Sequence, residues 1–167
     1  MVPVYVLKMI YNTIAVPYMN YAILAWGNAA NIHLSRLVKL QKRAIRILNH
    51  ESFLAHTTPI FYSLKLLTFY DVYKYQLGVF MFLCHIKILP TSILNYFTLN
   101  LNLHSYATRN AHKFHLPKVR TSISHKSPLF QGPLLWNSLP EDIRESKSVN
   151  VFKMKYKQYL INTYTCE

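Results

Sequence analysis

The most regular stretch of the chain is NIHLSRLVKLQKRAIRILN, residues 31–49, and its spacing predicts an amphipathic α-helix. At 100° per residue, five basic side chains fall within a sector of about 120°: Arg36, Lys39, Lys42, Arg43 and Arg46. The rest of the helix surface is mostly apolar, with Leu34, Leu37, Val38, Leu40, Ala44, Ile45, Ile47 and Leu48. We expect the apolar side to pack on a core and the basic side to face solvent.

Gln41 interrupts this apolar side near its middle. Buried amides in proteins are nearly always hydrogen-bonded. We therefore expect Gln41 to be a buried amide that bonds to neighbouring backbone, in preference to a catalytic role.

The helical period recurs along most of the chain, and the 167 residues include only three glycines. These features predict an all-α fold, an irregular bundle of about six helices. Thr58-Pro59 and a Thr68-to-Asp71 cap are helix start signals, and Pro17 is expected to interrupt the first helix. The expected helices cover residues 4–26 (ending at Gly27 as a left-handed cap), 31–49, 58–67, 68–88, 127–137 and 149–164, with one or two turns in 91–97 and a short turn of helix in 141–144.

Residues 98–127 differ in character from the rest. They are rich in Asn, Ser, Thr, His and Lys and contain no acidic residue. Their weak periodicity predicts a long irregular segment with a short extended piece near residues 114–116.

The charge of the chain is strongly unbalanced. It has 19 Lys and Arg against 6 Asp and Glu, a formal net charge of +13, while 51% of its residues are apolar. This composition indicates one folded domain, or one domain and part of a second. Its positive charge attracts polyanions such as nucleic acid. A solvated basic surface, a ribosomal protein and a membrane-surface protein are the alternatives.

The two cysteines, Cys84 and Cys166, lie far apart and predict no disulfide framework, as is typical of a reducing compartment. No signal peptide is evident. The apolar run at residues 14–30 contains Pro17, Asn20 and Asn28, so a membrane span is not expected.

The sequence predicts no catalytic centre, no metal site and no cofactor. Polymerase chemistry needs carboxylates that converge on magnesium, but Asp71 stands alone and Asp142 and Glu145 lie at a helix start. His112 and His115 have a spacing compatible with zinc, yet no closely spaced cysteine pair accompanies them.

A second basic segment lies within the irregular region. It contains Arg109, Lys113, Lys118 and Arg120, with His112, His115, His125 and Lys126 and the aromatic residues Tyr106 and Phe114. Basic side chains neutralise phosphates and aromatic rings stack on unpaired bases. For Tyr106 and Phe114, packing in a core is the preferred interpretation. For residues 36–46, an ordinary solvated helix face is the alternative to a binding surface.

Several motifs occur in a defined order along the chain. The most specific is FQGPLLWNSLP at residues 130–140, followed by Ile143-Arg144 and Phe152-Lys153. Before it come a Tyr-rich helix ending in Trp26-Gly27, the LVKLQKRAIRI helix at 37–47, HTTPIF at 56–61, a segment with Tyr75, Leu77 and Phe80-Met81, and Arg109 with LPKVRT at 116–121. Together they resemble the C-terminal, post-palm region of non-LTR (LINE-type, jockey-like) retrotransposon reverse transcriptases.

This resemblance implies a thumb-like helical region at residues 1–97 and a C-terminal extension at 98–167. It implies a fragment of an RNA-directed DNA polymerase, without the catalytic palm, that binds template–primer nucleic acid non-specifically. The expected partners are the backbones of RNA, DNA or RNA–DNA hybrid, and the remaining reverse transcriptase domains, in the nucleus or cytoplasm. No membrane partner and no catalysis by this chain are expected.

Two other interpretations remain open at the level of sequence. The chain could be a domesticated or degenerate basic helical protein-interaction module with no nucleic-acid role, or a membrane-associated helical protein that uses residues 4–26. Under all of these interpretations, the reverse transcriptase one included, we expect Trp136 to be a core residue that fastens the C-terminal helix to the rest of the fold.

Overall fold

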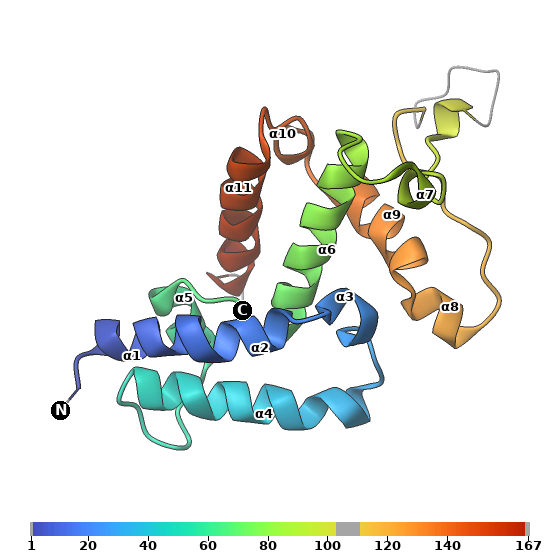
Figure 1. Cartoon of the computed structure of the whole chain (residues 1–167). Helices are drawn as coiled ribbons and strands as arrows, with labels where there is room; N and C mark the ends of the chain where they lie inside the picture. The colour runs from blue at the N-terminus through green and yellow to red at the C-terminus, as the bar shows by residue number, and fades with distance from the viewer. Residues whose placement is uncertain (1, 103–110, 166–167) are drawn as a thin grey trace. The chain divides into compact units, whose positions relative to one another are not determined.

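The computed structural model describes residues 2–102 and 111–165, and these residues form helices and loops without a β-strand (Figure 1). The all-α prediction is confirmed. In chain order the elements are α1 (Val4–Ile10), a π-helix (Tyr11–Ala15), α2 (Val16–Asn20), α3 (Ile23–Trp26), α4 (Asn31–Leu48), α5 (Thr58–Leu64), α6 (Phe69–His85), α7 (Thr91–Leu94), a 3-10 turn (Asn100–Asn102), α8 (Ser122–Lys126), α9 (Pro128–Ser138), α10 (Glu141–Arg144), α11 (Val149–Asn162) and a 3-10 turn (Thr163–Thr165).

The chain divides into two compact units. The first comprises Met1–Tyr75 and Lys157–Glu167, and the second comprises Gln76–Tyr156. The division expected at residue 97 falls inside the second unit. The boundary expected at residue 97 is based on composition and on the family resemblance, whereas the two units are defined by contacts. It therefore stays a prediction.

Next to Pro17 the N-terminal helical segment of the first unit changes from α-helix to π-helix and back, so the expected interruption is a local widening and not an end of the helix. Proline lacks the N–H that an α-helix bonds to the fourth preceding carbonyl. Here the turn before it, Tyr11–Ala15, widens to a π-helix, and Pro17 lies in the first turn of α2. The α2 helix ends at Asn20 with Tyr21 as its extended cap, and Ala22 takes the left-handed conformation with φ of 48°.

Gly27 is not the left-handed cap that the sequence predicts, since its φ is −66°. It is required for close packing. A Cβ atom at this position would lie 2.6 Å from the carbonyl oxygen of Ile23 and 2.7 Å from Cδ2 of Tyr73.

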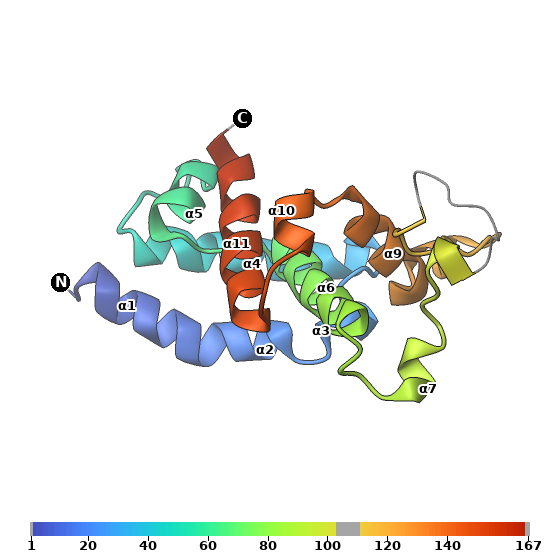
Figure 2. The same cartoon turned by 90° about the horizontal axis from the view of Figure 1, so that it is seen from above.

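The core of the first unit joins α4 and α5 to the N-terminal segment. It contains Tyr11, Ile45, Leu48, Ile60, Phe61, Leu64 and Leu66. The α1–α2 segment runs alongside α4 (Figure 1), and α5 lies beside α4 (Figure 2).

Gln41 is the hydrogen-bonding centre of this core, as predicted. Its Nε2 donates to the carbonyl oxygen of Leu67 and to the hydroxyl of Tyr11, both at 3.0 Å. Its Oε1 accepts the N–H of Phe69 at 2.8 Å. One amide therefore satisfies the free backbone donor at the first residue of α6.

The start of α6 carries the expected Thr68–Asp71 cap. The hydroxyl of Thr68 donates to the Asp71 carboxylate and accepts the Asp71 N–H. Tyr164, near the end of the chain, donates its hydroxyl to the same carboxylate at 2.6 Å and accepts the N–H of Thr68 at 3.0 Å. Burial and the bond to Asp71 raise the pKa of Tyr164 well above its usual value.

The second unit is built around Trp136, which is 1% exposed. Its ring packs on Phe82 of α6, Phe114 and Phe152 of α11. The predicted core role of Trp136 is thus confirmed. Gly78 of α6 provides space for Tyr156, because a Cβ there would lie 2.3 Å from Cε1 of that ring.

Residues 98–127 are the least regular described part, as expected, apart from the short helix α8, which the sequence pattern did not predict. Phe114 forms an isolated antiparallel bridge with Leu99, which accounts for the extended piece expected there. Thr121 caps α8 by accepting the N–H of Ser124.

Candidate nucleic-acid interface

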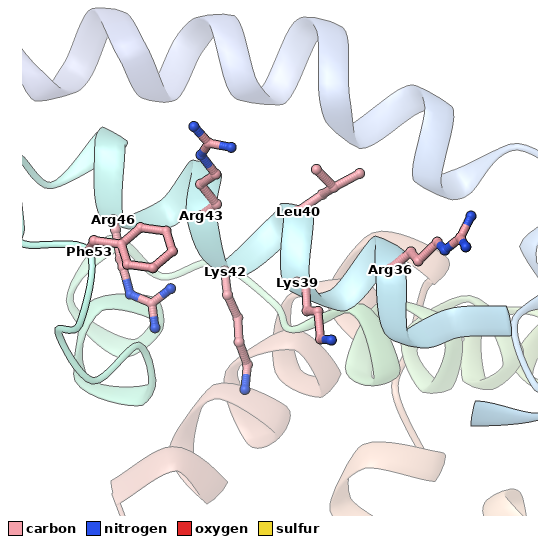
Figure 3. Close-up of a pocket in the computed structure, with 7 residues that line it drawn as sticks. All are labelled: Arg36, Lys39, Leu40, Lys42, Arg43, Arg46 and Phe53. Carbon is pink, nitrogen blue, oxygen red and sulfur yellow. The ribbon is translucent and has the colours of Figure 1, made fainter. Parts of the chain in front are cut away.

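The basic sector of α4 lies on the surface of the first unit. Arg36, Lys39, Lys42 and Arg43 are exposed and Arg46 is half-buried. They border an open groove of about 580 Å³ together with Leu40 and Phe53 (Figure 3). None of the seven lining residues is acidic, so the groove has an uncompensated positive charge.

The basic side chains of α4 extend to two sides of the helix. Figure 3 shows Leu40 and Arg43 extending toward the α1–α2 segment, while Lys39 and Lys42 extend the opposite way. From Arg36 to Arg46 the helix axis advances by about 15 Å. The arrangement can therefore hold a chain of several anionic groups along the helix.

Arg46 has a second role that the sequence did not indicate. Its Nε donates to the carbonyl oxygen of Ala55 at 2.8 Å, and its backbone carbonyl accepts the N–H of Glu51 at 2.9 Å. These bonds fix the loop that follows α4. The loop carries Phe53, whose ring centroid lies 6.0 Å from the Arg46 guanidinium carbon.

The exposed apolar residues of the groove are the part that sequence reasoning missed. Phe53 is 72% exposed and Leu40 is 61% exposed. Leu37, Leu40 and Ile47 were expected on the buried side of α4, but all three are exposed. The buried residues of α4 are Leu34, Gln41, Ile45 and Leu48, a strip narrower than the apolar sector.

The second basic segment is described only in part. Lys118 and Arg120 are exposed and Lys113 is half-buried, whereas Arg109 and Tyr106 lie outside the residues described. A hollow of about 360 Å³ is lined by Asn100, Lys113, Phe114, His115, Leu116 and Asn137. The ring of Phe114 is buried against Trp136, so it is a core residue.

The titratable residues that could take part in catalysis or metal binding either contact structural partners or lie on the surface. The Asp71 carboxylate is occupied by Thr68 and Tyr164, with Lys74 at 3.1 Å. Burial raises the pKa of the Cys84 thiol to about 11, which keeps it protonated near neutral pH. Within residues 2–102 and 111–165, no three His, Cys, Asp or Glu residues are arranged to hold a metal ion.

None of the helices in the described ranges is long and apolar enough to span a membrane. Comparison with known proteins gives no match to a family model, to a curated protein or to a solved structure.

Proposed function

We propose that this chain is a non-catalytic nucleic-acid-binding module that holds the phosphate backbone on the basic face of α4 without reading sequence. The observation that carries the proposal is the groove in which Arg36, Lys39, Lys42, Arg43 and Arg46 meet with no acidic lining residue. Surfaces without a binding role usually mix charges of both signs.

The physical basis is the release of counterions. Each Lys or Arg that neutralises a phosphate displaces condensed cations, so the affinity falls as salt rises. The net charge of +13 adds a long-range attraction for any polyanion. Binding of this kind positions a nucleic acid but does not distinguish sequences.

The resemblance to LINE-type reverse transcriptases supports a more specific version of the proposal. In that version the chain is part of an RNA-directed DNA polymerase, and α4 belongs to a thumb that contacts a template–primer hybrid. The remaining polymerase domains would be its protein partners. In that version a palm domain would catalyse the polymerase reaction, and this chain would only bind the nucleic acid.

The test is the salt dependence of binding to a labelled RNA–DNA hybrid, measured by fluorescence anisotropy between about 50 and 200 mM salt. The test variant combines Arg36→Ala, Lys39→Ala and Arg43→Ala, which spares Arg46 and its loop contacts. The matched control combines Lys147→Ala, Lys153→Ala and Lys157→Ala, exposed residues that remove the same net charge.

We expect the α4 variant to lower the salt slope by about 3 and the control by less than about 1. Circular dichroism should show equal helix content in both variants. Equal slopes in the two variants would remove α4 as the binding face. A wild-type chain whose binding ignores salt would contradict the nucleic-acid proposal as a whole.

A protein-interaction module is the second candidate function. The exposed apolar side chains Leu40, Ile47 and Phe53 favour it, because apolar groups gathered on a surface mark interaction sites. An acidic protein with apolar side chains would complement the same groove. Titration with an acidic polypeptide at fixed salt separates this candidate from the first.

A further inference from the structure

We infer that the groove beside Phe53 holds an unpaired nucleobase, so that the α4 face prefers single-stranded nucleic acid to a duplex. This inference rests on the proposed binding of phosphate backbones and names the substrate of the same site; it departs from the version in which α4 holds a template–primer hybrid. It concerns the apolar part of the groove, which phosphate binding alone leaves unexplained.

The first step is the presentation of the Phe53 ring. The ring is 72% exposed although the residue is aromatic and lies in a short loop. The loop is held in place by the bond from Arg46 Nε to Ala55, by the Glu51 N–H on Arg46, and by a turn from Ala55 N–H to Ser52. The backbone that carries this exposed ring is therefore held in place before any ligand arrives.

The second step is the chemistry of the groove around that ring. Leu40 and Phe53 supply apolar surface, and cations border them on both sides (Figure 3). A nucleotide in a single strand has the same two parts, a flat base with a π face and a phosphate with a negative charge. Bases stack on aromatic side chains whatever their identity, which agrees with binding that is not sequence-specific.

The third step excludes a duplex as the best ligand. In a duplex the bases are paired and stacked inside, and the phosphates form the outer surface. A duplex on α4 would contact the cations but leave Phe53 and Leu40 uncovered. A single strand can place a base on Phe53 while its neighbouring phosphates lie along the roughly 15 Å of α4.

An acidic peptide with apolar side chains also complements the charge of the groove. The nucleic acid is favoured because the cations recur at nearly every turn of α4, from Arg36 to Arg46, beside one exposed ring. A strand repeats one negative charge per nucleotide at regular intervals. The peptide enters the experiment as a competing outcome.

The experiment uses the full 167-residue chain and three fluorescein-labelled probes of equal length. They are oligo-dT, the abasic strand with the same phosphates, and a DNA duplex; polyglutamate is the fourth ligand. The variants are Phe53→Ala, Phe53→Leu and Phe53→Tyr. Leu54→Ala is the matched control, because Leu54 is the adjacent residue, is 88% exposed and does not line the groove.

We expect the wild type to bind oligo-dT about ten-fold more tightly than the abasic strand, the size typical of one stacked base. Phe53→Ala and Phe53→Leu should abolish this ratio and leave the salt slope unchanged. Phe53→Tyr and Leu54→Ala should keep it. An Arg46→Lys variant, which retains the charge but lacks the Nε donor to Ala55, should lower the ratio while the slope persists.

Equal binding of oligo-dT and the abasic strand, with the salt slope intact, would overturn this inference and leave the proposed function standing. A duplex bound more tightly than oligo-dT would overturn it as well. Failure to bind any of the three nucleic acids would remove the proposed function too. Polyglutamate binding as tight as that of oligo-dT, and lost in Phe53→Ala, would assign the groove to an acidic protein instead.

Discussion

The side-chain amide of Asn137 pairs with the backbone of Phe114 in both directions. Its Nδ2 donates to the Phe114 carbonyl oxygen at 2.8 Å, and its Oδ1 accepts the Phe114 N–H at 3.0 Å. Phe114 forms a bridge with Leu99 in which the flanking residues carry the hydrogen bonds. In such a pair the N–H and C=O of Phe114 point away from Leu99, and Asn137 occupies the place of a third strand.

Replacement of Asn137 by Ala should therefore destabilise the protein by about 1–3 kcal/mol, since it leaves a donor and an acceptor of Phe114 without partners. The free energy of unfolding in urea measures the loss. Asn150→Ala, at an exposed position of α11, is the control and should change stability by less than about 0.5 kcal/mol. Equal effects of the two substitutions would contradict the assigned role.

Replacement of Gln41 by Leu should cost at least about 2 kcal/mol, although the side chain becomes more apolar. The change removes the bonds to Leu67, Phe69 and Tyr11 together. Tyr11→Phe removes only one of the three and should cost about 1 kcal/mol. Urea unfolding of both variants tests this order; a Leu variant as stable as the wild type would show that the bonds contribute nothing net.

The substitution Gly78→Ala should reverse the usual effect of such a change. Alanine in a helix interior is normally favoured over glycine by about 1 kcal/mol. Here the added Cβ would meet Cε1 of Tyr156, a fully buried ring, at 2.3 Å. We expect a lower melting temperature than that of the wild type, and a higher one would show that Tyr156 moves aside readily.

Truncation of Trp136 to Ala should destabilise the second unit by about 3–5 kcal/mol, because it leaves a cavity among Phe82, Phe114 and Phe152. Trp136→Phe fills part of that cavity and should cost less. Melting curves followed by circular dichroism provide the comparison. A variant with unchanged stability but lost nucleic-acid binding would assign Trp136 to a ligand contact.

His85 should make the stability depend on pH. Its ring lies 5.2 Å from that of Trp136, and burial together with the charge of Arg144 lowers its pKa. The unfolded chain then takes up a proton at a higher pH than the folded chain does. Stability from this residue is full above about pH 6.5 and falls as the pH drops through that value toward the lowered pKa.

The measurement compares urea midpoints of the wild type and His85→Gln at neutral pH and near pH 5. The variant should lose less stability on acidification than the wild type. An identical loss in both proteins would show that other groups account for the acid dependence.

Periodicity and start signals predict most helices of this fold because those features are local. Residues 31–49 and 68–88 are examples, and the Thr68–Asp71 cap needs only three residues of spacing. The helix ends are less predictable. The left-handed positions after α4, α5 and α6 are His50, Lys65 and Lys87, and no described glycine has a positive φ.

The candidate site is likewise predictable where it depends on local helix geometry and not where it depends on tertiary contacts. The five basic residues of α4 share a face by helical geometry alone, so the sequence places them together. Phe53 joins them through the loop that follows α4, which the bonds of Arg46 to Glu51 and Ala55 help to hold in place. The pairing of Asn137 with Phe114 spans 23 residues and depends in the same way on tertiary contacts.

The bond between Tyr164 and the start of α6 has a consequence for synthesis of the chain. Thr68 and Asp71 emerge from the ribosome long before the residue that completes their hydrogen bonds. Until Tyr164 has been synthesised, water must take its place as the hydrogen-bond partner of the Thr68 N–H and of the Asp71 carboxylate. The first unit, whose parts include residues 157–165, can therefore complete its native contacts only after all of the second unit, residues 76–156, has been synthesised.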